Sequence, residues 1–215
     1  MAHALKKKYE SSRQLARQAS ILAATRDMLA EVGYTGTTMR NLAQRAGVVP
    51  GTLYNLYGSK DELILAALED MLDEVAGRAF AESEAGIDRI IALRERAGDA
   101  IVDNPAYAEA MGRALFHSAA DHPLKVLLYD RTVDFIVEQL RSGQQNGEID
   151  KAAKIELYAR HSAAQAWGVI MAWVMGVFTL DEVRREYLRA QVYVLLPIVC
   201  DSYRDALLRR AGLTS

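Results

Sequence analysis

Residues 37–60 read TTMRNLAQRAGVVPGTLYNLYGSK, and this stretch decides the fold of the N-terminal part of the chain. Thr38 is a favoured N-cap residue and predicts a short helix over about 39–46, which Gly47 ends. Pro50 predicts the start of a second short helix, because its missing N–H would be unpaired at a first helical position anyway. Two short helices joined by a tight turn are typical of a helix-turn-helix.

The tip of the second short helix has the small residues that a DNA-reading helix needs. In a helix-turn-helix the first helix bridges the phosphate backbones, while the second presents its N-terminal residues to base edges in the major groove. Pro50, Gly51 and Thr52 are small enough for that approach, and Leu53 and Leu56 can face the core behind them. The pattern predicts double-stranded DNA as a partner.

Positive charge is concentrated in the same N-terminal part of the chain. Residues 1–60 contain nine Lys or Arg and three Asp or Glu, whereas the remainder contains 17 basic and 25 acidic residues. A basic end on an acidic body favours contact of that end with a polyanion. The first residues form a basic arm, which is either a solvated tail or an arm that follows the minor groove or the phosphates: Lys6, Lys7, Lys8, Arg13 and Arg17.

Apolar residues recur at helical spacing through almost the whole chain, so we predict an all-α protein of about nine helices. The expected helices cover about 17–32, 39–46 and 50–57, then a long helix capped by Ser59, then 87–102, 105–118, 123–143, 150–176 and 181–209, the last with a kink at Pro197. We expect an N-terminal arm and three-helix helix-turn-helix DNA-binding domain over 1–60. A larger helical bundle follows over 61–215, and the family resemblance given below implies that it binds an effector and forms the dimer.

Several other classes of protein do not fit the sequence. No run of about 18 uncharged apolar residues occurs, so we expect no membrane partner. The sequence lacks G-x-S-x-G, P-loop and GxGxxG motifs and histidine pairs at metal-binding spacing, so we expect no catalytic residues, no metal and no cofactor. Cys200 is the only cysteine, which suits a reducing cytoplasm.

Five segments of the N-terminal region together resemble the signature of the TetR family of transcriptional regulators. They are ILAA at 21–24, EVGY at 31–34, TTMRNLA at 37–43, AGV at 46–48 and GTLYNLYGSK at 51–60. The remainder of the chain is similar to the family only in the number and length of its helices.

The resemblance implies a set of DNA-contacting residues. They lie at the start of the second helix, at the groove end of the recognition helix and at the start of the fourth helix: Thr38, Arg40, Val49, Pro50, Gly51, Thr52, Tyr54 and Lys60. Tyr54 and Lys60 would each meet a phosphate. Phosphate contacts position a protein on DNA, and base contacts specify the sequence.

Two departures from the family pattern affect the recognition helix. Val49 stands where many members have Ser or Thr, so the helix lacks its usual cap side chain, although Val49 can pack on a thymine methyl group. Asn55 and Leu56 replace a more common His or Tyr pair. Asn55 can read adenine, contact a phosphate or remain solvated, so it joins the candidate DNA-binding residues.

The resemblance also implies a homodimeric repressor that a small, mostly apolar effector releases from its operator. The candidate effector-pocket residues, for which core packing is the alternative, are Tyr107, Met111, Arg113, His117, Trp167 and Met171. Small residues of the eighth helix would allow close approach of a second subunit: Ala159, Ala163, Ala166, Gly168 and Ala172. Two other functions stay open, a DNA-binding regulator controlled by a protein partner and an enzyme on a helical scaffold.

Overall fold

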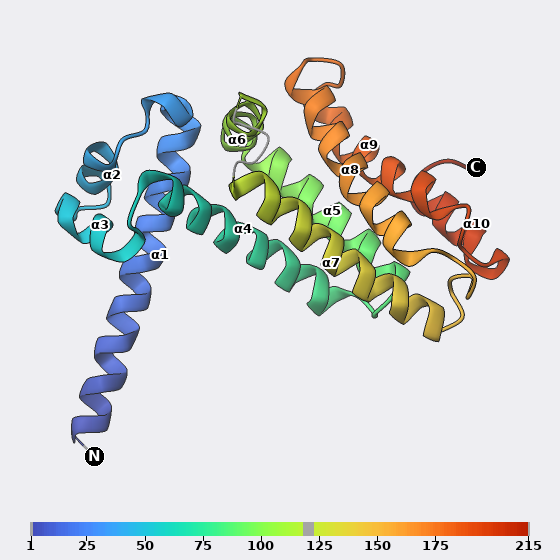
Figure 1. Cartoon of the computed structure of the whole chain (residues 1–215), viewed down its shortest axis with the longest axis horizontal. Helices are drawn as coiled ribbons and strands as arrows, with labels where there is room; N and C mark the ends of the chain where they lie inside the picture. The colour runs from blue at the N-terminus through green and yellow to red at the C-terminus, as the bar shows by residue number, and fades with distance from the viewer. Residues whose placement is uncertain (1, 118–122, 215) are drawn as a thin grey trace. The chain divides into compact units, whose positions relative to one another are not determined.

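The computed structural model describes residues 2–117 and 123–214. Within these residues it consists of helices with one isolated β-bridge, which confirms the predicted all-α class. The ten helices of this part of the chain, shown in Figure 1, are α1 (Ala2–Gly36), α2 (Met39–Arg45), α3 (Pro50–Tyr57), α4 (Lys60–Glu82), α5 (Ile87–Asp103), α6 (Pro105–His117), α7 (Pro123–Gln145), α8 (Ile155–Val174), α9 (Leu180–Leu195) and α10 (Asp201–Arg210). None of the helices in the described residues is long and apolar enough to cross a membrane.

The helices form two compact units. The first unit consists of Met1–Asp73 together with Ala106–Met111, and the second consists of Glu74–Pro105 together with Gly112–Ser215. Helices α4 and α6 therefore each contribute residues to both units. The division of roles at residue 60 stays a prediction.

The first unit is built around the C-terminal half of α1. Its buried core joins residues of α1, α2, α3 and α4: Ile21, Met28, Met39, Leu42, Ala43, Leu53 and Leu63. Gly33 has φ +68° and interrupts the helical backbone of α1, as expected for a glycine in the left-handed region. The Thr37 hydroxyl then donates to the Gly33 carbonyl over 2.7 Å, and this bond holds the chain where it turns toward α2.

The expectation that Leu56 faces the core with Leu53 is wrong. Leu53 has no exposed surface, whereas Leu56 is 38% exposed. On a helix of 3.6 residues per turn, Tyr57 lies nearer than Leu56 to the direction of Leu53. Tyr57 accordingly packs against the core and Leu56 is left at the surface.

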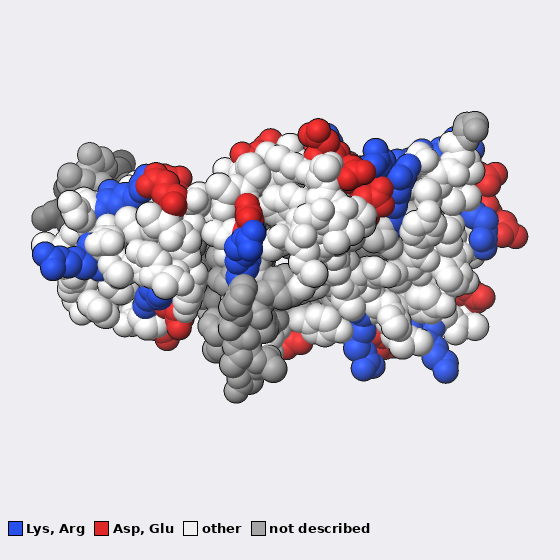
Figure 2. Space-filling model, turned by 90° about the horizontal axis from the view of Figure 1, so that it is seen from above, with Lys and Arg blue, Asp and Glu red and all other residues white. Residues whose placement is uncertain are grey.

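The second unit is a bundle in which α5 packs against α7 and α9, and α8 packs against α7 and α9. Its main core is aliphatic and includes Ile90, Ile91, Ile136, Leu140, Ile155, Val192 and Leu195. Basic and acidic side chains are both spread over the face of this unit that Figure 2 shows. Surface charge therefore does not mark one binding region on that face.

A buried polar group lies among α5, α8 and α9. Arg94 is only 3% exposed; its Nε donates to Gln191 Oε1 over 2.9 Å, and its Nη2 donates to the Ser162 carbonyl over 3.2 Å. Gln191 Nε2 donates to Ser162 Oγ over 3.0 Å, and the guanidinium lies 5.3 Å from the ring centre of Tyr187. The network satisfies polar atoms that would otherwise be costly to bury.

The predicted helix over 181–209 is not one kinked helix. It ends at Leu195, and α10 starts at Asp201, because Pro197 has no N–H to continue the ladder. The intervening backbone pairs instead with the turn before α8: the Cys200 N–H donates to the Glu148 carbonyl over 2.8 Å, and the Asp150 N–H donates to the Ile198 carbonyl over 2.9 Å. This pairing also explains why α8 starts later than the predicted residue 150.

The small residues of α8 do not all serve close approach by a second subunit. Ala159, Ala163 and Ala166 are buried within the second unit, where α8 packs on α7 and α9. The opposite side of α8 has a row of exposed or half-exposed residues at helical spacing: Leu157, His161, Ala164, Gly168, Met171 and Met175. A second subunit that packed against α8 would meet this outer row.

Candidate nucleic-acid interface

Helices α2 and α3 form the predicted helix-turn-helix. Thr38 Oγ1 accepts from the Asn41 N–H over 3.2 Å and caps α2, as predicted. Gly47 has φ +65° and allows the tight turn between the helices. Val49 occupies the N-cap position of α3 and makes no side-chain cap bond, so its side chain is free of that structural role.

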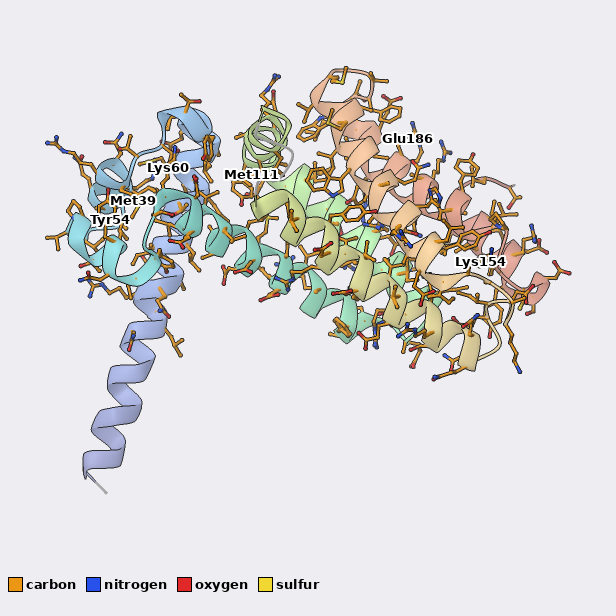
Figure 3. The ribbon with its side chains drawn as sticks, in the orientation of Figure 1. Met39, Tyr54, Lys60, Met111, Lys154 and Glu186 are labelled. Atoms are coloured by element: carbon orange, nitrogen blue, oxygen red, sulfur yellow. The ribbon has the colours of Figure 1, made fainter. Side chains whose placement is uncertain are left out.

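The structure brings the predicted DNA-binding residues together on α2, α3 and the start of α4. Figure 3 labels Met39, Tyr54 and Lys60, one from each of these helices. Seven of the nine are exposed: Thr38, Arg40, Val49, Pro50, Gly51, Tyr54 and Asn55. Val49 and Tyr54 are 68% and 54% exposed, so both side chains are accessible. Their contacts with DNA stay predictions.

Lys60 is half-buried and already has partners within the first unit. Its Nζ donates to the Tyr34 carbonyl over 3.2 Å and lies 4.0 Å from the centre of the Tyr34 ring. The Tyr34 hydroxyl donates to Asp61, and burial together with this bond raises the pKa of Tyr34 to about 12. A phosphate contact by Lys60 would have to add to these interactions or replace them.

Two ion pairs hold α1 against its neighbours in the first unit. Arg26 Nη1 donates to Asp70 over 2.7 Å and to the Ala67 carbonyl over 3.3 Å, which ties α1 to α4. Arg45 pairs through both terminal nitrogens with Glu31, which ties α2 to α1 and lowers the pKa of that carboxyl group. These ion pairs hold α1 to α2 and α4, the helices that precede and follow α3 in the chain.

Arg17 lies beside the recognition helix but is not among the DNA-binding residues that the family signature implies. Arg17 is exposed on α1, and its Nη2 donates to Thr52 Oγ1 on α3 over 3.4 Å. The two residues are 35 positions apart, so no local spacing could have shown the contact. The one signal in the sequence that relates Arg17 to a DNA-binding surface is the basic character of the N-terminal arm.

The candidate effector-pocket residues are distributed over the two units. Tyr107 and Met111 are buried in the first unit, where the Tyr107 hydroxyl has no hydrogen-bond partner among the described residues and burial raises its pKa. In the second unit Arg113 is exposed, while Trp167 and Met171 are half-buried. The side chain of His117 lies outside the described residues. The pocket stays a prediction.

The second unit also has a small open hollow of about 140 Å³ beside the start of α5 and along α10. Its floor is apolar and includes Ile87, Ile91 and Leu207, and Arg210 lies at its edge. Arg210 bonds to Asp88 and to both oxygens of Glu95, so the polar edge is already paired. None of the candidate effector residues lines this hollow.

Comparison with known proteins identifies the helix-turn-helix unit. Residues 21–67 match the model of bacterial regulatory proteins of the tetR family. The helix-turn-helix segment of the chain matches the TetR family. The matched segment includes α2, α3 and the first residues of α4, so it covers the candidate DNA-binding residues described above.

HTH-type transcriptional repressors are similar to the chain over longer stretches. The chain is 25% identical over 186 residues to the transcriptional repressor KstR2 of Rhodococcus jostii, covering 83% of this chain and 91% of that protein. It is 33% identical over 113 residues to the repressor KstR of Mycolicibacterium smegmatis, covering 51% and 55% of the two chains.

Solved structures share the TetR-family fold. The structure of SmeT, the repressor of a Stenotrophomonas maltophilia multidrug efflux pump, superposes with a TM-score of 0.69 at 19% identity and covers 86% of this chain and 91% of SmeT. A TetR-family regulator from Rhodococcus sp. gives a TM-score of 0.65 at 22% identity, with 84% and 99% covered. At these identities the likeness extends to the fold only.

Proposed function

We propose that the protein is a homodimeric transcriptional repressor that binds double-stranded DNA through α3 and leaves its operator when a small, mostly apolar effector binds. The observation that carries the DNA-binding role is the make-up of α3. This helix buries one side chain completely, Leu53, and exposes Val49, Tyr54 and Asn55 around it. A helix anchored at one point and open elsewhere suits insertion into a major groove.

The candidate DNA-binding residues divide into two roles in this proposal. Val49, Thr52 and Asn55 face base edges, where a methyl contact to thymine or an amide pair with adenine distinguishes sequences. Arg40, Tyr54 and Lys60 face phosphates and set the register of α3 on the duplex. Thr38 both caps α2 and lies exposed at its start, so it belongs with the residues that face phosphates. Pro50 and Gly51 are small and permit close approach of α3 to the DNA.

The test is the affinity of the full chain for the DNA upstream of its own gene, compared with a scrambled duplex of the same length, at about 150 mM salt. A specific regulator binds its site about a thousandfold or more tightly than unrelated DNA. Equal affinity for the two duplexes, and for other regulatory regions of the same genome, would contradict the proposal.

The proposal of an apolar effector is supported by a fold neighbour and by one unpaired group. SmeT, similar to this chain over 86% of its length, has been solved in complex with triclosan. In this chain the buried Tyr107 hydroxyl, which has no partner among the described residues, could bond to a polar atom of a bound molecule. Helix α4, which runs through both units, would transmit the change to α3.

An effector can shift DNA affinity only by its difference in affinity for the two conformations. A panel of small apolar compounds, triclosan included, should therefore contain one that weakens operator binding by about 5- to 150-fold. Tyr107→Phe should reduce that response without changing DNA affinity in the absence of the compound. A response that is identical in Tyr107→Phe would remove Tyr107 from the pocket.

We propose that the two subunits meet through the outer row of α8. Gly168 and Ala164 are small, and Leu157 and Met175 are 46% and 71% exposed in the single chain. A two-fold dimer would present two α3 helices to successive major grooves, about 34–36 Å apart. A regulator of this kind acts on chromosomal DNA, so we place it in the cytoplasm and assign it no reaction, metal or cofactor.

A further inference from the structure

The small hollow of the second unit has no assigned role, and one face of α10 shapes it. Tyr203, Ala206, Leu207 and Arg210 line the hollow from α10. These four residues are spaced at i, i+3, i+4 and i+7, so they share one side of the helix. Because Ala206 has the shortest side chain of the four, this row leaves a space of about 140 Å³ between α10 and the start of α5.

The floor of the hollow is apolar. Ile87 and Ile91 of α5 and Leu207 of α10 are buried in the core of the second unit, and their hydrocarbon also lines the hollow. An apolar cavity of about 150 Å³ is large enough to bind benzene. The hollow therefore suits the ring of a small aromatic molecule.

The polar rim of the hollow is acidic. Asp88 and Glu148 line it, and Glu95 adjoins it because both of its carboxylate oxygens bond to Arg210. Arg210 is the one cation among the lining residues that the structure describes. Three carboxylates beside one guanidinium leave a surplus of two negative charges. This surplus favours a cation over an anion in the hollow.

Glu148 is the carboxylate of the rim that has a free oxygen. Its Oε2 accepts from the Ile87 N–H over 2.8 Å and so fixes the carboxylate at the start of α5, whereas its Oε1 accepts no hydrogen bond from the described residues. Both oxygens of Asp88 already accept hydrogen bonds. Tyr203 is 39% exposed, and the face of an aromatic ring attracts cations.

We propose that this hollow binds a small organic ammonium ion that has an aromatic ring. The ring packs on Ile87, Ile91 and Leu207, and the ammonium group donates to Glu148 Oε1, with Tyr203 as a second wall. None of the candidate effector residues lines the hollow, so this site is distinct from the proposed effector pocket. The proposal goes beyond the repressor function and does not depend on it.

The test is a titration of the ¹⁵N-labelled full chain with benzylamine at about pH 7, followed through the amide chemical shifts. A ligand of about eight non-hydrogen atoms should bind with a Kd on the order of 1 mM. The largest shifts should occur at Ile87, Glu148 and Leu207. Benzyl alcohol has a similar shape without the charge and should bind about tenfold more weakly, because it cannot form a charge-assisted bond to the carboxylate.

Three variants locate the site. Glu148→Gln removes the charge but keeps an acceptor for the Ile87 N–H, and it should weaken benzylamine binding about tenfold. Asp205→Asn is the matched control: it removes a charge from an exposed position of α10 that does not line the hollow, and should change the Kd by less than about twofold. Ala206→Leu fills the hollow from an exposed helix position that leucine suits, and should abolish binding.

The proposal is overturned if the wild-type chain shows no saturable shifts up to about ten times the expected Kd. It is overturned equally if benzylamine and benzyl alcohol bind alike, or if Glu148→Gln has no more effect than Asp205→Asn, because the acidic rim then selects no cation. Wild-type binding by an Ala206→Leu chain whose urea unfolding is unchanged would place the ligand elsewhere. The assay contains no DNA, so each of these failures leaves the proposed DNA-binding function intact.

Discussion

The buried network around Arg94 offers a sharp test of how the second unit is held together. Gln191 and Ser162 are 2% and 1% exposed, so neither they nor Arg94 can exchange a lost bond for one to bulk water. Gln191→Leu keeps a similar volume but removes the acceptor of Arg94 Nε and the donor to Ser162 Oγ. A buried charge that loses a hydrogen bond costs about 1.5–3 kcal/mol, and the orphaned Ser162 hydroxyl adds about 1.

We therefore expect Gln191→Leu to lower the free energy of unfolding of the second unit by about 3 kcal/mol. Both tryptophans, Trp167 and Trp173, lie on α8, so urea unfolding followed by tryptophan fluorescence reports on this unit. Gln165→Leu is the matched control, because Gln165 is exposed on the same helix and should change stability by less than about 0.5 kcal/mol.

A double-mutant cycle decides whether the loss comes from the charge. Replacing Arg94 by Met in the Gln191→Leu background removes the unpaired guanidinium, and apolar replacement of a whole buried polar set is often neutral or stabilising. The double variant should therefore be more stable than the sum of the two single losses predicts. If Gln191→Leu costs no more than Gln165→Leu, or if the two losses simply add, the network does not act as described.

Three further outcomes follow from other parts of the structure. Leu53→Ala should destabilise the first unit by about 2–5 kcal/mol in urea unfolding, whereas Leu56→Ala should cost less than about 1, because only Leu53 is fully buried; equal losses would contradict the packing. The pKa of Tyr34 is raised in the folded state above its ordinary 10.0, so its contribution is present below pH 10 and is lost as the pH rises from 10 toward 12; Tyr34→Phe should lose less stability over this range. Gly168→Trp should convert a dimer to a monomer in light scattering after size exclusion, while Gly77→Trp, on another open helix surface, should not; a dimeric Gly168→Trp would exclude the outer row of α8 as the interface.

Local signals in the sequence were enough to predict the helix-turn-helix. The cap at Thr38, the turn at Gly47 and the first-turn proline at position 50 act within a few residues, and α2 and α3 begin and end where these residues predict. The outward position of Leu56 was missed, because on so short a helix a difference of one residue decides which side chain reaches the core.

Contacts between distant residues could not be predicted. The pairing of Lys60 with Tyr34, the contact of Arg17 with Thr52 and the network of Arg94 each join helices that spacing alone does not bring together. The break before α10 depends equally on a partner, since residues 198–200 leave the helix to pair with the turn before α8. The candidate DNA-binding residues lie together because they belong to consecutive helices, whereas the candidate effector residues are far apart in the sequence.

The central claim is that the exposed tip of α3 reads DNA sequence. Selection of bound duplexes from a randomised pool, followed by sequencing, measures this directly for the full chain and for Asn55→Ala. The wild-type chain should enrich one motif, repeated in two halves about one helical turn apart, and Asn55→Ala should relax the preference at one base position in each half. The claim would be contradicted if the wild-type chain enriched no motif. It would also be contradicted if Asn55→Ala, Thr52→Ala and Val49→Ala each enriched the wild-type motif unchanged.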